Sequence, residues 1–257
     1  MLKTRIKILF KLFKEKMRKF VHPRIDKNNK TIFLERKKFY SSFLSVNDIV
    51  FDVGANLGNR VEVFLSLNNK VIAVEPQTYC AEYLRIKFGK TITLKQVALG
   101  EKKDTRKMYI NNDSPTISSL SKEWIEAMKN TRFKGQRWDE TCEVTIDTLD
   151  NLIAQNGLPR FIKIDVEGFE SEVLKGLSQT VPFISFEYTT PEQVDKLYDC
   201  LEIVKRLNPA YLCNYSAGEK NNFVFKEWFS VDDFKNKISS DIDALEGFGD
   251  VYVKLPF

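Results

Sequence analysis

The chain has 257 residues, 43% of them hydrophobic and 29% charged, a composition that favours one globular domain with a large core over a disordered chain. No stretch approaches the roughly 20 apolar residues that a membrane-spanning helix needs. The net charge is +5, but residues 1–20 hold eight Lys or Arg against Glu15, so this segment carries +7 and the rest −2, which argues against nucleic acid as a partner.

Residues 1–23 are predicted to form a basic arm that precedes the main domain, 24–257. Its apolar residues recur every three or four positions, which puts them on one face of a helix, with lysines and arginines elsewhere: Ile6, Leu9, Phe10, Phe13, Met17 and Phe20. Pro23 is expected to end this helix, and the sole histidine, His22, is interpreted as a linker residue. Two roles stay open: contact with an anionic membrane surface, or docking on the domain or a partner.

From residue 47 onward, strand-like and helix-like segments alternate. This alternation predicts a Rossmann-like α/β domain, with a mostly parallel sheet and helices on both faces. Strands are expected at 49–53, 70–74, 92–97, 161–165, 183–187, 210–215 and 251–255. Helices are expected up to residue 67 after the first strand, then at 78–88, 169–177 and 191–207.

Residues 104–142 break this alternation. The segment is polar and irregular, with a short helix expected at 121–130. An insertion at this point of a doubly wound fold lies near the carboxyl ends of the strands, where ligands bind. Two interpretations remain open: a segment that covers the substrate, or a variable surface loop.

The most informative stretch is residues 51–59, where a strand runs into a turn with Gly54 and Gly58. Glycine permits positive φ angles and a close approach of ligand to backbone. Asp52, at the end of the strand, is able to bind a positively charged group. Glu75, at the end of the second strand, is placed to bind both ribose hydroxyls of an adenosine.

The glycine spacing distinguishes between two cofactors that such a site could bind. A dinucleotide site requires G-x-G-x-x-G, which this chain lacks. The pattern here is G-x-x-x-G preceded by Asp52, whose charge suits the ammonium group of a methionine moiety and would repel a pyrophosphate. The sequence therefore predicts S-adenosylmethionine as the cofactor rather than a nicotinamide dinucleotide.

These residues belong to a set of segments in which the chain resembles the FkbM-type methyltransferases. The segments follow the family's order and lie at 51–58, 74–76, 97–100, 118–120, 145–150 and 163–170. The resemblance covers about residues 45–190, and neither the arm nor 191–257. It implies a class I methyltransferase fold with a seven-stranded sheet, and O-methylation, commonly of sugars or other hydroxylated metabolites.

The resemblance also implies which residues bind the cofactor. On the family pattern they come from the first glycine turn, the second strand end and the third strand end. They are Asp52, Gly54, Ala55, Asn56, Gly58, Glu75, Pro76, Gln96 and Ala98, with Asp165 at the neighbouring strand end. Gln96 and Ala98 are expected near the adenine.

Methyl transfer to a hydroxyl group needs alignment of the acceptor and removal of its proton. Asp165 and Glu187 end two successive predicted strands, so either is a candidate base if these strands are neighbours. Lys163 lies two residues before Asp165, on the same strand face, where it would offset the carboxylate charge. Glu167 is either catalytic or bound to helix amides, whereas a structural role is favoured for Glu170.

A divalent metal is the alternative to a base. Asp165 and Glu187 together could hold Mg²⁺, which would lower the pKa of the acceptor hydroxyl. The analogy is with catechol-type enzymes of the same fold, and the sequence identifies no third oxygen ligand.

The expected acceptor is a saccharide or sugar nucleotide, with a lipid or another small hydroxylated metabolite as the alternative. A non-catalytic S-adenosylmethionine-binding or scaffold protein is the rival of a different class. Nucleic acid is disfavoured because there is neither an Asn/Asp-Pro-Pro-aromatic motif nor a Pro-Cys dipeptide. The four cysteines lack CxxC spacing and no secretory signal is evident, so a cytoplasmic protein is expected, with the arm at the inner membrane surface if it binds lipid.

Overall fold

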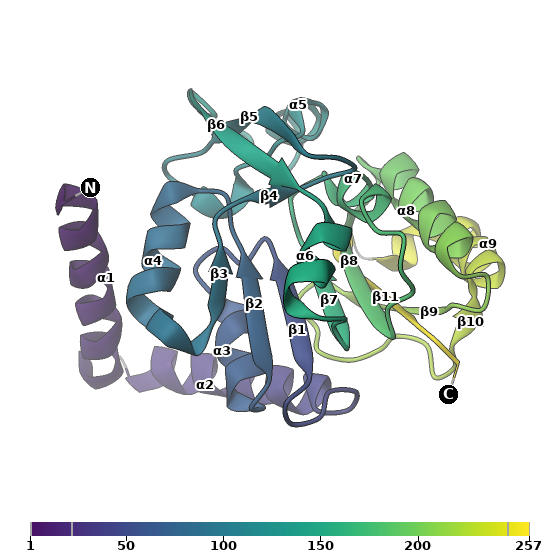
Figure 1. Ribbon diagram of the computed structural model, residues 1–257, viewed down its shortest axis with the longest axis horizontal. Coiled ribbons are helices and arrows are strands. Elements are labelled where there is room, and N and C mark those ends of the chain that lie inside the picture. Colours follow the sequence, from purple (N-terminus) through teal and green to yellow (C-terminus); the bar gives the residue numbers. More distant parts are fainter. Residues whose placement is uncertain (1, 22, 246, 257) are drawn as a thin grey trace.

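The computed structural model describes residues 2–21, 23–245 and 247–256, so His22 lies outside the described part. A central sheet is covered by helices on both faces, and a smaller sheet lies above it (Figure 1). The helices are α1 Leu2–Val21, α2 Pro23–Tyr40, α3 Asn59–Ser66, α4 Thr78–Phe88, α5 Lys122–Asn130, α6 Leu149–Asn156, α7 Glu170–Lys175, α8 Val194–Leu207 and α9 Val231–Ser240. The strands are β1 Ile49–Val53, β2 Lys70–Val74, β3 Thr93–Lys95, β4 Ala98–Leu99, β5 Asp104–Ile110, β6 Glu140–Asp147, β7 Phe161–Ile164, β8 Phe183–Thr189, β9 Leu212–Ala217, β10 Phe229–Ser230 and β11 Phe248–Lys254.

The central sheet has the order β10-β9-β11-β8-β7-β1-β2-β3. Strands β3, β2, β1, β7 and β8 are parallel neighbours, and β11 runs antiparallel to both β8 and β9. The chain moves outward from β1 to β3 and then returns to β7 on the other side of β1. This reversal places a ligand-binding crevice at the carboxyl ends of β1 and β7.

The strand count corrects the expectation of seven strands. The central sheet has eight, because the two-residue strand β10 pairs with the edge of β9. Such a short edge strand has no periodic pattern of its own, so the sequence did not predict it. The mostly parallel α/β architecture with helices on both faces is confirmed.

Strict alternation of side chains along the strands builds two apolar layers. Phe51 and Val53 of β1 pack in the layer formed with α6, α7, α8 and α9, whereas Val50 packs with α2 and α3 on the opposite face. Asp52 therefore points to the same face as Val50, and Lys163 of β7 lies beside it in register. Two charged side chains are thus buried on the α2–α3 face of the sheet.

Residues 104–142 are more regular than expected. β5 and β6 form an antiparallel pair that joins β4 in a separate three-stranded sheet, and α5 matches the predicted short helix. The pair was missed because most side chains of β5 and β6 are exposed or half-buried and therefore polar. Figure 1 shows β5, β6 and α5 at the top of the view, above the central sheet.

Two helices, α1 and α2, make up the N-terminal part of the chain, and the second one leads into the domain. α1 ends at Val21 as predicted, but α2 starts at Pro23, a residue that the first turn of a helix accepts because its amide needs no partner there. Phe39 and Tyr40 at the end of α2 are buried in the core. No described helix is long and apolar enough to cross a membrane.

Candidate active site

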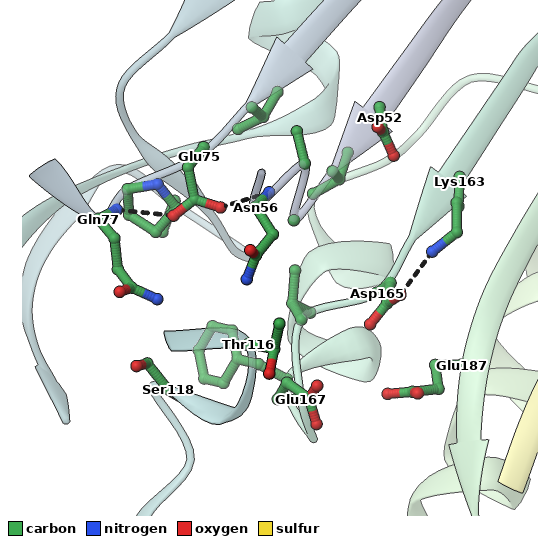
Figure 2. A pocket seen from close by; sticks show the side chains of 18 of the residues that line it. Asp52, Asn56, Glu75, Gln77, Thr116, Ser118, Lys163, Asp165, Glu167 and Glu187 are labelled. Atoms are coloured by element: carbon green, nitrogen blue, oxygen red, sulfur yellow. Dashed lines mark hydrogen bonds and ion pairs between the residues drawn. The ribbon is translucent and has the colours of Figure 1, made fainter. Parts of the chain in front are cut away.

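A cavity of about 680 Å³ opens at the carboxyl ends of β1, β2, β7 and β8, at the reversal of strand order. Most residues that the sequence singled out line it: Asp52, Gly54, Ala55, Asn56, Glu75, Pro76, Ala98, Lys163, Asp165, Glu167 and Glu187. Gly58 and Gln96 do not. The cavity therefore brings the predicted cofactor-binding and catalytic residues into one site (Figure 2).

The turn after β1 forms one wall of this cavity. Gly54 has a φ of 84°, and a Cβ at this position would collide with the backbone carbonyl oxygen of Asp165. The Gly54 and Ala55 amides both donate to the Val74 carbonyl at 3.0 Å, and the Asp165 amide donates to the Val53 carbonyl at 3.0 Å. These bonds join the ends of β1, β2 and β7, so only glycine fits at this crossing.

Glu75 is fixed at the end of β2 by backbone amides. Its carboxylate accepts from the Asn56 amide and from the Gln77 amide, each at 2.8 Å, as Figure 2 shows. Burial raises the pKa of Glu75 to about 7, although these two hydrogen bonds lower it. Each oxygen keeps a lone pair that can accept from a further donor, as the binding of two ribose hydroxyls requires.

Asp52 and Asn56 present polar atoms that have no partner within the described residues. The Oδ2 atom of Asp52 and the Oδ1 atom of Asn56 are buried and make no hydrogen bond. Burial raises the pKa of Asp52 to about 6, while the Lys163 and Arg60 charges lower it. Because buried acceptors are rarely left unpaired, these two oxygens fit a ligand with an ammonium donor, such as the amino-acid end of S-adenosylmethionine.

Lys163 is buried between acids. Its Nζ lies 2.6 Å from Oδ2 of Asp165, and only 2% of its side chain is exposed. Burial opposes the charged form, but the Asp165 and Asp250 carboxylates raise the pKa of Lys163 above its ordinary value, so it stays charged. The predicted pairing of Lys163 with Asp165 is therefore present in the structure.

Asp165, Glu167 and Glu187 form a carboxylate cluster on the far side of the cavity. β7 and β8 are parallel neighbours, and one carboxylate oxygen from each of the three residues lies within 4.8 Å of the others. Figure 2 shows the three side chains pointing toward one another, away from Glu75. Burial, together with the Asp165 charge, raises the pKa of Glu167 and of Glu187 well above the ordinary range. A raised pKa makes the carboxylate form of each residue a better proton acceptor.

The turn that carries Glu167 is held by the insertion and by Glu170. Glu167 has a φ of 55°, and its carbonyl accepts from the Ser119 hydroxyl at 2.6 Å. Glu170 accepts from the Val166 and Gly168 amides, which is the structural role that the sequence favoured for it. A Cβ on Gly168 would collide with Trp124 of α5. The insertion therefore positions this turn.

The remaining cavity wall contains residues that the sequence analysis did not identify. Gln77 bridges the cofactor side to the insertion, because its carboxamide donates to the Pro115 carbonyl at 2.8 Å. The insertion and neighbouring loops also line the cavity with Met108, Thr116, Ser118, Trp124, Met128, Arg132 and Phe133, together with Phe169 and Phe248. Most of them come from the insertion, which has neither a glycine turn nor a strand-end acid, whereas Ser118 and Phe169 lie in the family segments 118–120 and 163–170 but were given no role.

Two of the predicted cofactor-binding residues lie elsewhere. Gly58 has a φ of 80° at the start of α3, and a Cβ there would meet Leu84 and Phe88 of α4, so it serves helix packing. Gln96 is exposed, and its carboxamide is bonded to Arg85 and Thr78. Neither residue lines the cavity, and contact of either with the cofactor stays a prediction.

Three solved structures similar to the chain are methyltransferases by their names. They are a precorrin-6y C5,15-methyltransferase from Geobacter metallireducens (13% identity, 86% of each chain covered, TM-score 0.44), a TehB-like SAM-dependent methyltransferase from Corynebacterium glutamicum (7% identity, 86% of this chain and 88% of that chain, TM-score 0.45), and an rRNA methylase from Streptococcus thermophilus (11% identity, 86% and 94%, TM-score 0.44). None of the curated proteins compared with the chain matches it.

The family model of the methyltransferase FkbM domain matches residues 52–218, about two thirds of the chain. The matched segment starts at Asp52 and includes the glycine turn, Glu75, the insertion and the carboxylate cluster. The resemblance drawn from the sequence motifs is thereby confirmed. The chain belongs to the methyltransferase FkbM domain family and is an S-adenosylmethionine-dependent methyltransferase.

Proposed function

We propose that the chain methylates a hydroxyl group of a saccharide or sugar nucleotide. The observation that supports this most strongly is the carboxylate cluster of Asp165, Glu167 and Glu187, which shares one cavity with the cofactor-binding residues. A hydroxyl is a poor nucleophile at neutral pH, so its methylation needs a group that accepts its proton. An acceptor that is already nucleophilic would not require buried carboxylates.

Glu187 is the proposed base, and Asp165 orients the acceptor. Asp165 is held by charged Lys163 at 2.6 Å, so it remains an acceptor for the substrate hydroxyl. Burial beside Asp165 and Glu167 raises the pKa of Glu187 above its ordinary value, which makes its carboxylate a stronger proton acceptor than an exposed one. S-adenosylmethionine supplies the electrophilic methyl group. The hydroxyl oxygen would take this methyl group from the sulfur, and the hydroxyl proton would pass to Glu187.

The residues that line the cavity support a saccharide as the acceptor. Trp124, Phe133, Phe169 and Phe248 present aromatic surface, while the carboxylate cluster presents hydrogen-bond acceptors. A sugar ring has apolar C–H faces, which would pack on the aromatic side chains, and a rim of hydroxyl groups, which would donate to the carboxylates. Charged Arg132 also lines the cavity, and it holds Glu192 and the Gly247 carbonyl.

Glu167 adds a third oxygen ligand to the Asp165–Glu187 pair considered from the sequence for Mg²⁺. The three carboxylates would then bind the cation, which would lower the pKa of the acceptor hydroxyl without a protein base. Dialysis against a chelator separates the two routes: the base route predicts unchanged transfer, and the metal route predicts loss that added Mg²⁺ restores.

The test is transfer of a labelled methyl group to a panel of sugar nucleotides, glycolipids and unrelated nucleophiles. We expect label in a hydroxylated acceptor, and a loss of about 10²- to 10⁴-fold in the Glu187→Gln and Asp165→Asn variants, with binding of the cofactor retained in Glu187→Gln. Glu123→Gln, an exposed acid on α5 paired with Lys196, is the matched control. Label found only in protein or RNA would contradict the proposal.

A further inference from the structure

The outer face of α1 carries a cluster of exposed apolar side chains. Among the described residues, half of the large hydrophobic side chains that are exposed lie on this helix, and the others are scattered over the molecule. The five are Ile6, Leu9, Phe10, Phe13 and Met17, between 41% and 60% exposed. Their spacing of three or four residues places them on one side of the helix. Exposed apolar patches of this kind mark interaction sites.

The opposite side of α1 is attached to the domain. Ile8 is fully buried, Arg5 forms an ion pair with Glu82 of α4 at 2.6 Å, and the Tyr83 hydroxyl donates to Glu15 at 2.8 Å. Lys11 lies over the Tyr83 ring. Figure 1 shows α1 alongside α4 at the edge of the molecule. The docked side therefore fixes the direction of the apolar face, which is turned away from the domain.

Basic side chains border this apolar face. Lys7, Lys14 and Lys16 are exposed, and the Nζ of Lys14 lies 4.5 Å from the ring centroid of Phe10. Residues 1–20 carry +7, whereas the remainder of the chain carries −2. A positive border around a strip of phenylalanine and leucine matches a surface that is apolar within and negatively charged at its rim. Anionic lipid headgroups over acyl chains have this arrangement.

We propose that α1 binds the protein peripherally to anionic membranes, with Leu9, Phe10 and Phe13 inserted among the lipids and the lysines at the headgroups. The helix lies in the membrane surface, because no described helix is able to span a bilayer. This contact holds the enzyme at the membrane surface. The cavity is not part of the contact, because α4 lies between α1 and the rest of the domain (Figure 1). This role is independent of the acceptor proposed above, since neither α1 nor its lysines line the cavity.

The test is flotation of the full chain with vesicles of phosphatidylcholine alone or mixed with phosphatidylglycerol. We expect binding to the anionic vesicles, weakened as salt is raised and weak on phosphatidylcholine alone. The triple change Leu9→Gln, Phe10→Gln and Phe13→Gln should lower the apparent affinity about tenfold or more. The matched control changes Leu34, Leu158 and Val224, three exposed apolar residues outside α1, to Gln and should bind as the native chain does.

A second pair of variants tests whether the positive charge of the α1 lysines contributes to vesicle binding. Lys7→Glu, Lys14→Glu and Lys16→Glu together should abolish the preference for anionic vesicles, whereas the same change at exposed Lys90, Lys134 and Lys226 should leave it. S-adenosylmethionine binding and the melting temperature, unchanged in every variant, show that the fold is intact. Equal binding to both kinds of vesicle, or no effect of the α1 triple changes, would overturn the proposal. So would a dimer in light scattering that forms through α1 in place of vesicle binding.

Discussion

At the scale of single residues, the predicted cofactor site contains two carboxyl groups, of Asp52 and Glu75, that are buried in the free protein. Asp52 has a pKa of about 6 and Glu75 a pKa of about 7, both raised by burial. Each acid therefore carries less charge in the free protein than an exposed acid would at the same pH. A cationic ligand beside Asp52 restores its charge, so binding of the cofactor is coupled to loss of a proton.

This coupling predicts how binding of S-adenosylmethionine depends on pH. Affinity should rise as the pH passes through about 6, because only ionised Asp52 attracts the ammonium group. The Asp52→Asn variant should bind about 30-fold more weakly at pH 8, equivalent to about 2 kcal/mol, and show a flatter profile. Isothermal titration calorimetry at a series of pH values measures both. A profile equally steep in the variant would assign the effect to another group.

Single residues also show which parts of the site could be predicted. Asp52 and Glu75 were predictable because each ends a buried strand and so must lie at the edge of the sheet. Trp124 and Arg132 were not, because they reach the cavity from α5 and the loop that follows it, and their place depends on how the insertion folds back. Gln96 stands beside a predicted strand end, but its side chain turns outward to Arg85.

At the scale of elements, the close crossing of the β1 turn with the end of β7 is the tightest constraint on the site. Gly54 and Gly135 have the same φ of 84°, but a Cβ meets the Asp165 carbonyl at Gly54 and nothing within 4 Å at Gly135. Substitution by alanine would strain the backbone at both positions, but it would add a steric clash only at Gly54.

Gly135→Ala should cost about 1 kcal/mol of stability, for the backbone alone, whereas Gly54→Ala should cost roughly 3 kcal/mol or more and disturb cofactor binding. Urea unfolding followed by tryptophan fluorescence gives both values. Equal losses of stability at the two positions would mean that β1 and β7 move apart easily. The close crossing would then not constrain the site.

Helix α5 lines the cavity, so we expect its N-terminal cap to affect binding of the acceptor. Ser121 caps α5 by accepting from the Trp124 amide at 3.0 Å, and Thr148 caps α6, which does not line the cavity, by accepting from Asn151 at 3.1 Å. Either change to Ala should cost about 1 kcal/mol. Steady-state kinetics should show a raised KM for the acceptor in Ser121→Ala only. The same KM change in Thr148→Ala would indicate a general loss of stability instead.

Helices and strands that bury one or both faces in the core were predictable from their hydrophobic pattern. The bounds predicted for β1, β2 and α4 match the structure, because each has continuous apolar residues or a clear helical repeat. The β5–β6 pair was interpreted as irregular since its small sheet buries few side chains. The two-residue strand β10 exists only through its pairing with β9.

At the scale of the whole molecule, several buried acids titrate between their ordinary pKa and about 7. Glu75 and Glu170 have pKa values of about 7 and Asp52 about 6, all raised by burial. In this range the native state binds more protons than the unfolded chain. The stability of the cofactor-free protein is therefore predicted to fall as pH rises from about 4.5 to about 7.

Urea unfolding at fixed ionic strength checks this sign. The free energy of unfolding should be higher at pH 5 than at pH 7.5, and Glu75→Gln, which keeps the buried group neutral, should reduce the difference. Glu123→Gln, an exposed change, should leave it unaltered. A free energy of unfolding that rises from pH 5 to pH 7.5 would show that the pKa values of these carboxyls are not raised by burial.

The molecule as a whole combines a cofactor cavity at the carboxyl edge of its sheet, an insertion above that edge, and a basic helix on the opposite side of α4 from the core. We propose that the carboxylate cluster in this cavity makes a saccharide hydroxyl the methyl acceptor. The most direct measurement is nuclear magnetic resonance of the product formed with a ¹³C-labelled methyl donor. We predict a single labelled methyl ether on a sugar carbon. A labelled methyl group on nitrogen, sulfur or carbon would contradict this account.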